Sequence, residues 1–549
     1  MKSERLRWVT AVRVSTAIVA VSLLIGAMTA AAQTYSDLHD LDGSTDGSYP
    51  QQPGILAQGR DGNLYGTNPW GGTNGHGTVF EVTPSGTLTP LYNFSGTTNV
   101  FATSGLTLGL DGNFYGTTQF GGVNNYGSIF KITATGVLTT LHSFSGPSPG
   151  DGTDPSGAPV QGRDGNFYGA VGTPGPNACA PSAYKISSSG TFKTISSSIP
   201  GCSSAPLVLG VDDNFYGTTF NGGAYGLPNG YGTVYKMSPA GVVEVIYNFD
   251  NTHGAYPYAR LIQGADGTFY GTTWQGGSHG AGVVFRLTAA GSITLLHQFD
   301  LTDGCLPYAG LVAASDGNFY GATYNCGSAN AGVLFKVTKA GIYAVLTSFD
   351  VTHGGYPSPT PIQSTNGKIY GLTNQGGTNG LGVYYSLEVG LKPFVLLETT
   401  SGTAGQRIQI LGNGLTGTSS VKFGTGPASF TVVSDTYLSA IVPATGTTGW
   451  VTVTTPSGTL TSSAQFKVIP KITSFSPTSG TVGTQVAITG TGLKQVSKVS
   501  FGGVNAPTFT VNSATKVTAT VPTGAKTGKI AVTTPGGGTS SAAIFTVTP

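Results

Sequence analysis

Few side chains in this sequence have the type and spacing that catalysis requires. The 549 residues contain only seven histidines and four cysteines. The histidines do not stand in the H-E-x-x-H spacing of a zinc-binding helix or in another metal pair; they are His39, His76, His142, His253, His279, His297 and His353. The sequence also lacks a G-x-S-x-G nucleophile elbow and a phosphate-binding P-loop. We therefore predict no catalytic residue and no metal site.

One acidic segment is loosely similar to a calcium loop. Asp40, Asp42 and Asp46 lie in D-L-D-G-S-T-D-G. The segment lacks the full series of oxygen ligands and the closing bidentate Glu of such loops. We expect a turn after an N-terminal strand here, and no cofactor, with calcium as the weaker alternative.

Aromatic residues form the more informative set. One aromatic side chain precedes each of five Gly-rich loops: Trp70, Phe120, Phe220, Trp274 and Tyr324. Tyr49, Tyr256 and Tyr356, each before Pro, are expected near the same place. A sugar ring could stack on such side chains, since binding sites are mostly apolar and concave. The alternative is that these rings pack between structural units and anchor loops.

Basic residues form a second series, one residue after a strand aromatic. They are Lys131, Lys185, Lys236, Arg286 and Lys336. They could form a stripe for an anionic polymer. We favour the simpler interpretation of solvated strand positions whose charge hinders aggregation.

These residues belong to a repeat. A Tyr-Gly pair recurs at spacings of 48–54 residues, at Tyr65, Tyr115, Tyr168, Tyr216, Tyr270, Tyr320 and Tyr370. Each copy divides into four short strands, the first two joined by an Asp-Gly turn, which is a strong hairpin signal. The turn acids (Asp61, Asp111, Asp164, Asp212, Asp266 and Asp316) are therefore interpreted as turn formers. The period predicts a seven-bladed β-propeller over residues 33–392, with a β-solenoid as the alternative.

The N-terminal segment Tyr35–Leu41 resembles the fourth strand of a copy, whereas the seventh copy lacks one. We expect this segment to complete the last blade and close the ring, which would remove exposed strand edges. In a four-stranded antiparallel blade, the loop that enters a copy and the Gly-rich loop lie on one face. Cysteines in these loops predict two disulfides, Cys179–Cys202 and Cys305–Cys326.

The units D-G-N-F-Y-G-T-T, G-G and G-V-V-F-R-L-T resemble the GloVer tandem repeats of secreted bacterial proteins, over about Tyr35 to Val389. To our knowledge that family has no assigned activity, so the resemblance implies no catalytic residues. The two units 393–469 and 470–549 are similar to IPT/TIG domains, which are immunoglobulin-like β-sandwiches. The segment S-P-T-S-G-T-V-G-T-Q-V-A-I-T-G-T-G-L carries this likeness, and the first unit departs from it with Glu398 and Thr399 in place of Ser476 and Pro477.

The N-terminus indicates export. Lys2, Arg5, Arg7 and Arg13 precede an apolar run from about Val14 to Met28 and then three alanines, as in a cleavable signal peptide of residues 1–32. The run is shorter than the roughly 20 residues of a membrane span, so we expect no transmembrane segment in the mature chain. Export would favour disulfides.

Charge is unevenly distributed. Residues 33–392 hold 12 basic and 20 acidic residues, whereas residues 393–549 hold nine basic and two acidic ones. Because basic residues do not predominate over the whole chain, a nucleic-acid partner is not expected.

We predict a secreted or cell-surface, non-enzymatic binding or structural protein. Its expected partners are an extracellular glycan or envelope polymer, or other surface proteins. A polysaccharide lyase or glycosidase on a propeller scaffold is the alternative.

Overall fold

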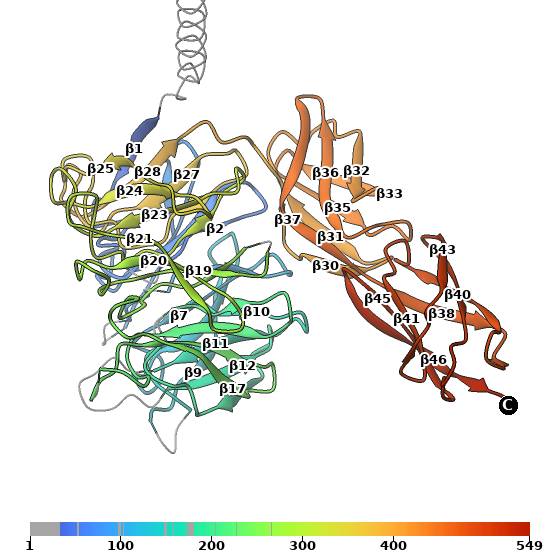
Figure 1. Cartoon of the computed structure of the whole chain (residues 1–549). Coiled ribbons are helices and arrows are strands. Elements are labelled where there is room, and N and C mark those ends of the chain that lie inside the picture. The colour runs from blue at the N-terminus through green and yellow to red at the C-terminus, as the bar shows by residue number, and fades with distance from the viewer. Residues whose placement is uncertain are drawn as a thin grey trace, which may run out of the picture.

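The fold is described by a computed structural model covering residues 33–549, apart from 52–53, 97–99, 103, 148–150, 156, 173–180, 204, 227 and 265. The expected signal peptide and Cys179 therefore lie outside the described residues. The secondary structure of the described chain is entirely β (Figure 1). Within those ranges no helix has the length and apolar character needed to cross a membrane.

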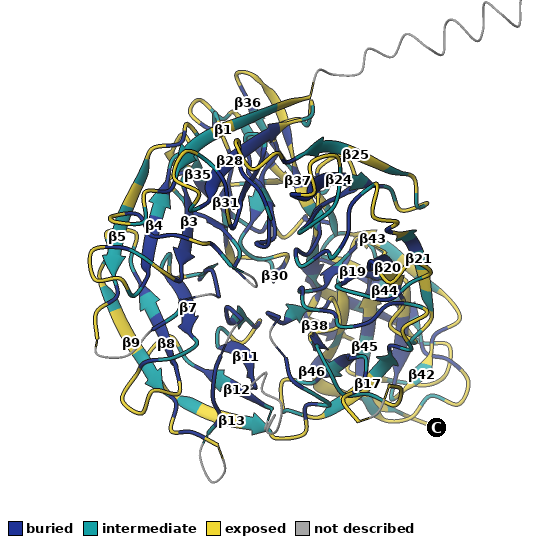
Figure 2. Ribbon diagram, turned by 90° about the vertical axis from the view of Figure 1, so that its left-hand side faces the viewer, coloured by how far each residue is buried: buried dark blue, intermediate teal, exposed yellow. Residues whose placement is uncertain are grey.

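The first part of the chain forms seven four-stranded antiparallel sheets among the described residues. Figure 2 shows these sheets arranged around a common centre, as the blades of a propeller. We number the blades 1–7 in chain order. Their strands are: blade 1, β2 (Ala57–Gln58), β3 (Leu64–Asn68), β4 (Thr78–Val82) and β5 (Leu88–Asn93); blade 2, β6 (Thr107–Leu108), β7 (Phe114–Thr118), β8 (Ser128–Ile132) and β9 (Leu138–Ser143); blade 3, β10 (Val160–Gln161), β11 (Phe167–Val171), β12 (Ser182–Ile186) and β13 (Phe192–Ser196); blade 4, β14 (Val208–Leu209), β15 (Phe215–Thr219), β16 (Thr233–Met237) and β17 (Val243–Asn248); blade 5, β18 (Ile262–Gln263), β19 (Phe269–Thr273), β20 (Val283–Leu287) and β21 (Ile293–Gln298); blade 6, β22 (Val312–Ala313), β23 (Phe319–Thr323), β24 (Val333–Val337) and β25 (Tyr343–Ser348); blade 7, β26 (Ile362–Gln363), β27 (Ile369–Leu372), β28 (Val383–Glu388) and β1 (Thr34–Asp40).

The Asp-Gly turns form as the sequence predicts. In blade 2, Asp111 accepts hydrogen bonds from the backbone N–H of Asn113 and from the hydroxyl of Tyr115, and Gly112 has a φ of 82°. Glycine adopts this left-handed conformation without a steric penalty. Because the carboxylate is used within its own turn, the interpretation of these acids as turn formers is confirmed.

The Phe-Tyr pair of the repeat joins neighbouring blades. Adjacent residues of a strand point to opposite faces of the sheet, so Tyr and Phe contact different neighbours. Tyr115 of blade 2 stacks on Phe167 of blade 3 with ring centroids 3.8 Å apart, and Tyr216 of blade 4 packs on Phe269 of blade 5 at 4.1 Å. These buried rings form much of the core between blades.

The N-terminal strand closes the ring as expected. β1 pairs antiparallel with β28, from Thr34 opposite Glu388 to Asp40 opposite Val383. The resulting sheet has the order β1-β28-β27-β26. Both ends of the ring thus belong to one blade, and the outer edge of β28 is covered.

Two β-sandwiches follow the ring (Figure 1). Both have the same topology, with the sheet order β29-β31-β35-β34 against β30-β37-β36-β32-β33 repeated as β38-β40-β44-β43 against β39-β46-β45-β41-β42. The strands of the first sandwich are β29 (Leu396–Leu397), β30 (Ser401–Thr403), β31 (Arg407–Leu411), β32 (Ser420–Phe423), β33 (Gly426–Ala428), β34 (Phe430–Ser434), β35 (Tyr437–Ile441), β36 (Gly449–Thr455) and β37 (Gly458–Ile469). Those of the second are β38 (Lys471–Ser476), β39 (Ser479–Gly480), β40 (Gln485–Thr491), β41 (Lys498–Phe501), β42 (Val504–Asn505), β43 (Phe509–Ser513), β44 (Lys516–Thr520), β45 (Gly528–Thr534) and β46 (Gly537–Val547).

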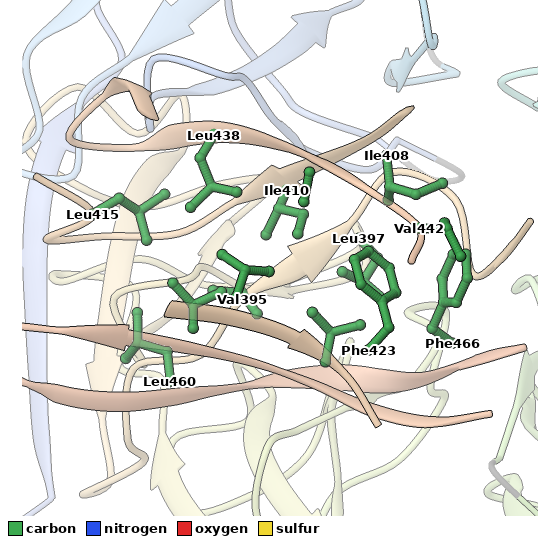
Figure 3. Close-up of a cluster of buried hydrophobic side chains, with 14 of the residues drawn as sticks. Val395, Leu397, Ile408, Ile410, Leu415, Phe423, Leu438, Val442, Leu460 and Phe466 are labelled. Carbon is green, nitrogen blue, oxygen red and sulfur yellow. The ribbon is translucent and has the colours of Figure 1, made fainter. Parts of the chain in front are cut away.

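Each sandwich has its own apolar core. In the first, Ile410 and Leu438 from one sheet face Phe423 and Phe466 from the other (Figure 3). Val486, Ile488, Phe501 and Phe545 form the equivalent core of the second. This alternation of buried and exposed residues along the strands is what a two-sheet sandwich requires.

Candidate functional site

The two ends of the ring differ. In a four-stranded antiparallel blade, the loop between strands one and two lies at one end, and the loop between strands two and three lies at the other. We call the end with the Asp-Gly turns the turn face. The opposite end carries Trp70, Phe120, Phe220, Trp274 and Tyr324, and we call it the aromatic face. The five predicted aromatic residues are thus on one face.

Backbone hydrogen bonds fix the loops of the aromatic face. The N–H of Tyr256 donates to the carbonyl of Tyr231 in blade 4, and the carbonyl of Tyr256 accepts from the N–H of Trp274 in blade 5. One residue therefore ties two blades together. It does so at a positive φ of 58°, and Tyr49, Phe101, Asp154, Leu306 and Tyr356 repeat this conformation. Such strained residues persist where the surrounding structure holds them firmly.

The rings of this face form two groups. In the longer one, Tyr258 packs on Phe220 at 4.4 Å, on Trp274 at 5.7 Å and on Tyr308 at 5.2 Å between ring centroids. Tyr324 continues the row from Tyr308 to Tyr356. The shorter group joins Trp70 to Phe101 and Phe101 to Phe120. These contacts support the expectation that the rings pack between blades and anchor loops, and the sugar-stacking alternative stays a prediction.

A hollow of about 430 Å³ lies on this face where blades 7 and 1 meet. Tyr49, Gln51, Trp70, Asn374 and Gln375 line it. Tyr49 and Trp70 are 37% and 36% exposed, more than the half-buried rings of the longer row. Two partly exposed rings lie beside the amides of Gln51, Gln375 and Asn374, although Asn374 is 8% exposed and its Nδ2 already donates to the carbonyl of Pro50. Such a surface can stack on a sugar and hydrogen-bond its hydroxyls.

Asp154 is a residue of this face that the sequence did not single out. It occupies in blade 3 the position that Tyr256 occupies in blade 5, and it is 7% exposed. Burial raises the pKa of its carboxyl to about 6. Desolvation is the cause of this shift, and no charged group adds to it.

Five histidines pair with aspartates and so stabilise the loops between blades. The Nε2 atoms of His39, His142 and His297 each lie 2.7 Å from a carboxylate oxygen in the following loop, on Asp46, Asp151 and Asp303. His253 and His353 pair in the same way with Asp250 and Asp350, through Nδ1. Within the described residues, no cluster of three or more His, Cys, Asp or Glu side chains could hold a metal.

In the loosely calcium-like segment, the carboxylates hold the loop itself. Asp42 Oδ1 accepts from the N–H groups of Ser44 and Thr45 at 2.8 Å, and Asp46 Oδ1 accepts from the N–H of Asp42 at 2.8 Å. These bonds shape the turn that the sequence favours here, directly after β1.

The basic series faces the acids of its own blades. Lys185 Nζ lies 2.7 Å from Asp164, and Lys336 Nζ lies 2.9 Å from Asp316. Each ammonium also lies 5.5 Å from the ring of the blade's Tyr. Lys185 and Lys336 are therefore already paired, whereas Arg286 of the same series is exposed, so the geometry gives only partial support to a stripe free to bind an anionic polymer.

The disulfide expected between Cys305 and Cys326 is present, with the Cα atoms 5.4 Å apart. It joins the loop leading into blade 6 to the Gly-rich loop of that blade, on the aromatic face. The second expected pair, Cys179–Cys202, stays a prediction because Cys179 lies outside the described residues.

The first sandwich covers part of the turn face. Arg60, beside the turn of blade 1, makes two hydrogen bonds of 2.7 Å to the carboxylate of Glu398 and lies over the ring of Tyr437. Arg163 of blade 3 contacts Ser401, and Lys467 Nζ donates to the carbonyl of Val211 in blade 4. The departure of the first sandwich from its motif at Glu398 therefore creates a contact with the ring.

The fold defines a β-propeller protein followed by two immunoglobulin-like domains, the first of which packs on the turn face of the ring. The chain belongs to the Gloeobacter/Verrucomicrobia repeat family, whose profile matches residues 24–179, 155–385 and 289–424. Residues 395–468 and 470–547 match the IPT/TIG domain. Both resemblances inferred from the sequence are thus confirmed.

Similar solved structures include a virginiamycin B lyase from Staphylococcus aureus, with 14% identity and a TM-score of 0.45 over 65% of this chain and 99% of that one. A fungal alcohol oxidase of the AA5 family is 14% identical, with a TM-score of 0.45 over 77% of this chain and 98% of the other. The surface glycan-binding protein PbSGBP-B from Prevotella bryantii is 21% identical, with a TM-score of 0.21 over 27% and 38%. Identities this low say nothing about shared function. Among curated proteins, none matches the chain.

Proposed function

We propose that this protein is a secreted or cell-surface protein whose aromatic face binds glycans. The hollow at the junction of blades 7 and 1 is the observation that carries this proposal. Its exposed Tyr49 and Trp70 rings and its amides at Gln51, Asn374 and Gln375 have the chemistry of a carbohydrate site. Closure of the ring by β1 holds the two sides of the hollow in place, since it joins blade 7 to the start of the chain.

A binding role is favoured over a hydrolytic one. The acids of the turn face are used by their own turns, and those of the loops between blades pair with histidines. The pKa of two described acids, Asp154 and Asp37, is raised to about 6, chiefly by burial, but neither acid lines the hollow. Retaining and inverting glycosidases both need two carboxyl groups flanking the bond that is cleaved.

The experiment is a glycan array probed with the chain lacking residues 1–32, followed by calorimetry with the best ligand. Trp70→Ala is expected to weaken binding about 10- to 100-fold, because a well-placed aromatic contact contributes on the order of 1–3 kcal/mol. Trp450→Ala is the matched control, since Trp450 is 42% exposed but lies on the first sandwich. Absence of any glycan ligand, or equal binding by wild type and Trp70→Ala, would contradict the proposal.

We assign the second sandwich a role in holding the protein at an anionic envelope. Its residues, 470–549, include six lysines and no acidic residue. All six lysines are exposed: Lys471, Lys494, Lys498, Lys516, Lys526 and Lys529. Summed charge of one sign steers association with surfaces of the opposite sign.

Retention on isolated envelopes tests this role. Changing Lys516 and Lys529 to Gln should reduce retention at low salt, and retention should fall as the Debye length shortens from roughly 30 Å at 0.01 M to 8 Å at 0.15 M. Lys193 and Lys339, which are exposed on the ring, provide a control pair. Retention indifferent to salt, or equally reduced by the control pair, would rule out this role.

A further inference from the structure

A continuous row of rings crosses the aromatic face from blade 4 toward blade 7. It consists of Phe220, Tyr258, Tyr308, Tyr324 and Tyr356, whose successive ring centroids lie 4.4, 5.2, 5.2 and 5.3 Å apart. We call these five residues the tyrosine row. The rings are tilted against one another, by 44° between Tyr258 and Tyr308, and all five residues stay partly exposed. The row therefore offers aromatic surface at successive places along the face.

The tyrosine row ends at the hollow between blades 7 and 1. The N–H of Asn374, which lines the hollow, donates to the carbonyl of Tyr356, the last residue of the row. The side-chain amide of Asn374 and the hydroxyl of Ser358 both donate to the carbonyl of Pro50. Pro50 precedes Gln51, which also lines the hollow. The row and the hollow are thus parts of one surface.

The repeat changes where the rings give way to the hollow. When the copies are aligned on their Tyr-Gly pairs, Asn374 occupies the position of Trp274 and Tyr324. The residue that follows the Pro of the incoming loop changes as well: it is Tyr258, Tyr308, Ser358 and Gln51 in blades 5, 6, 7 and 1. Large rings are thus replaced by shorter polar side chains at one end of the row.

The hydroxyls of the row are open to a ligand. The four tyrosine hydroxyls form no hydrogen bond within the described part of the chain, and burial does not close them off as it does that of Tyr235. Burial and the neighbouring Tyr308 raise the pKa of Tyr258, so its hydroxyl stays protonated and lies within electrostatic reach of the next one. A phenolic hydroxyl both donates and accepts hydrogen bonds. The row therefore combines apolar rings with unused polar groups.

The charge around this surface is unfavourable for an anion. The side chains of the row and the hollow carry no formal charge, and the ring as a whole holds 20 acidic and 12 basic residues. The exposed Asp42 lies beside the hollow, because the carbonyl of Gly43 accepts from the N–H of Gly72, two residues after Trp70. Slight desolvation opposes ionisation of Asp42, but hydrogen bonds from its own loop outweigh it and lower its pKa, so this carboxylate stays charged. A negative field disfavours the approach of a negative ligand.

We infer that the tyrosine row and the hollow together bind an uncharged polysaccharide chain, with one sugar unit in the hollow and the following units along the row. A monosaccharide would need only the hollow. A polymer presents apolar ring faces and hydroxyls at regular intervals, and the row presents rings and hydroxyls in the same way. Aromatic surface with a few polar groups is the usual lining of such sites. This inference rests on the proposed function and adds the charge and the length of the ligand.

Calorimetry with four ladders of uncharged oligosaccharides, each from dimer to hexamer, tests the dependence on length. The ladders are cello-, manno-, xylo- and laminari-oligosaccharides. At least one ladder should bind, and its hexamer should bind about 10-fold more tightly than its dimer, because the row adds contacts that a dimer in the hollow does not reach. Equal affinity of dimer and hexamer in every ladder that binds, or no binding of any ladder, would overturn the inference.

Variants of the row separate its contribution from that of the hollow. Tyr308→Ser, which copies Ser358, should remove most of the gain from length and leave the affinity for the dimer unchanged. Trp70→Ala should weaken the binding of both lengths. Tyr126→Ser is the matched control, since Tyr126 is 38% exposed on the Gly-rich loop of blade 2, outside the row.

A second variant at the same position keeps the packing of the rings. Tyr308→Phe removes only the hydroxyl, so it tests the row even if Tyr308→Ser does not fold. It should bind the hexamer about threefold more weakly at an unchanged melting temperature, because one hydrogen bond to the ligand is lost. Wild-type affinity of Tyr308→Phe for the hexamer would contradict the inference.

The uronate counterpart of the ladder that binds tests the charge, because it adds a carboxylate to each sugar unit. Its hexamer should bind at least about 10-fold more weakly at low salt, and Asp42→Asn should narrow this difference. Equal or tighter binding of the uronate would overturn the inference. If a glycan binds through Trp70 but only when charged, or without a gain from length, this inference alone fails; if no glycan binds, the proposed function fails too.

Discussion

The turn face and the aromatic face are built by the same repeats, but they use their polar groups differently. On the turn face, Asp316 accepts from the N–H of Asn318, the hydroxyl of Tyr320 and Lys336 Nζ. On the aromatic face, the buried indole N–H of Trp274 has no acceptor among the described residues. The acid of the turn is thus used within the turn face, whereas the aromatic face holds a donor with no acceptor among the described residues.

This difference separates positions that recur in every blade from positions that occur once. The Asp-Gly turn and the Phe-Tyr pair return from blade to blade and hold the ring together. Arg260, Asp154 and the Asn374 that lines the hollow depart from their equivalents in other blades. In a repeat protein, residues that interrupt the pattern are the first candidates for function. The following predictions test this contrast.

The largest effect is expected where the turn face meets the first sandwich. The pair raises the pKa of Arg60, whereas burial still raises that of Glu398, so the intact pair gives little net stability. Arg60→Ala would leave a carboxylate that is 5% exposed without its partner, at a cost of about 3–5 kcal/mol. The sandwich should detach from the ring, and proteolysis between residues 388 and 396 should accelerate.

The double variant Arg60→Ala with Glu398→Ser removes both charges and copies the residue of the second sandwich. It should recover part of the lost stability in a double-mutant cycle. Arg60→Ala with unchanged protease resistance and an unchanged solution scattering profile would show that the pair does not hold the two parts together.

On the aromatic face, the disulfide should contribute the next largest effect. Changing Cys305 and Cys326 to Ser opens a loop of 21 residues, for which the chain-entropy estimate is about 3 kcal/mol. Urea unfolding measures the loss, and hydrogen exchange should locate the loosening in the loops of blade 6. A midpoint equal to that of the wild type would mean that the packing of the loops suffices without the bond.

Two of the histidine–aspartate pairs, His39–Asp46 and His142–Asp151, predict a pH optimum for the loops of the aromatic face. The hydrogen bond to Asp46 raises the pKa of His39 above its usual value, against the effect of burial, so its contribution is complete at low pH and is lost as pH rises through the folded pKa. Burial opposes ionisation of Asp151, but hydrogen bonds from Ser145 and His142 outweigh it and lower its pKa. That contribution is lost as pH falls through the folded pKa.

Each of these partly exposed pairs should contribute about 1 kcal/mol or less. Melting temperature against pH should therefore form a broad maximum, and His39→Asn should flatten its alkaline side. A profile that His39→Asn leaves unchanged on that side would exclude this pair as the cause.

The smallest effect is expected for the cations of the turn face. Lys336→Ala removes a partly exposed ion pair and should cost at most about 1 kcal/mol in thermal unfolding. Asp316→Ala should cost more, because the hydroxyl of Tyr320 and the N–H of Asn318 also lose their acceptor. Equal losses of stability in the two variants would mean that Asp316 stabilises the fold through its ion pair and not through its turn.

The sequence was sufficient for the features that repeat and for two that occur once, the closing strand at Tyr35 and the Cys305–Cys326 disulfide. Seven Tyr-Gly pairs and the unpaired segment at Tyr35 allowed the sheets and their closure to be predicted. Glu398 was visible as a departure from its motif, but its partner Arg60 is 338 residues away, a distance that no local pattern bridges. Arg260 could have been found by aligning the copies, which places an arginine among six uncharged residues. Its burial, which lowers the pKa of the guanidinium, required the fold.

Closure of the ring by β1 has a consequence for the timing of folding. A ribosome makes the N-terminus first, and Thr34 must wait for Glu388, its partner 354 residues later. At roughly 5–20 residues per second, that wait lasts on the order of 20–70 s. During it, β1 is a solitary strand, and its Asp37 and Asp40 supply the charge that discourages wrong pairing. The first strand to be synthesised is thus among the last to find its place, and a chain cut short before residue 383 leaves it without a partner.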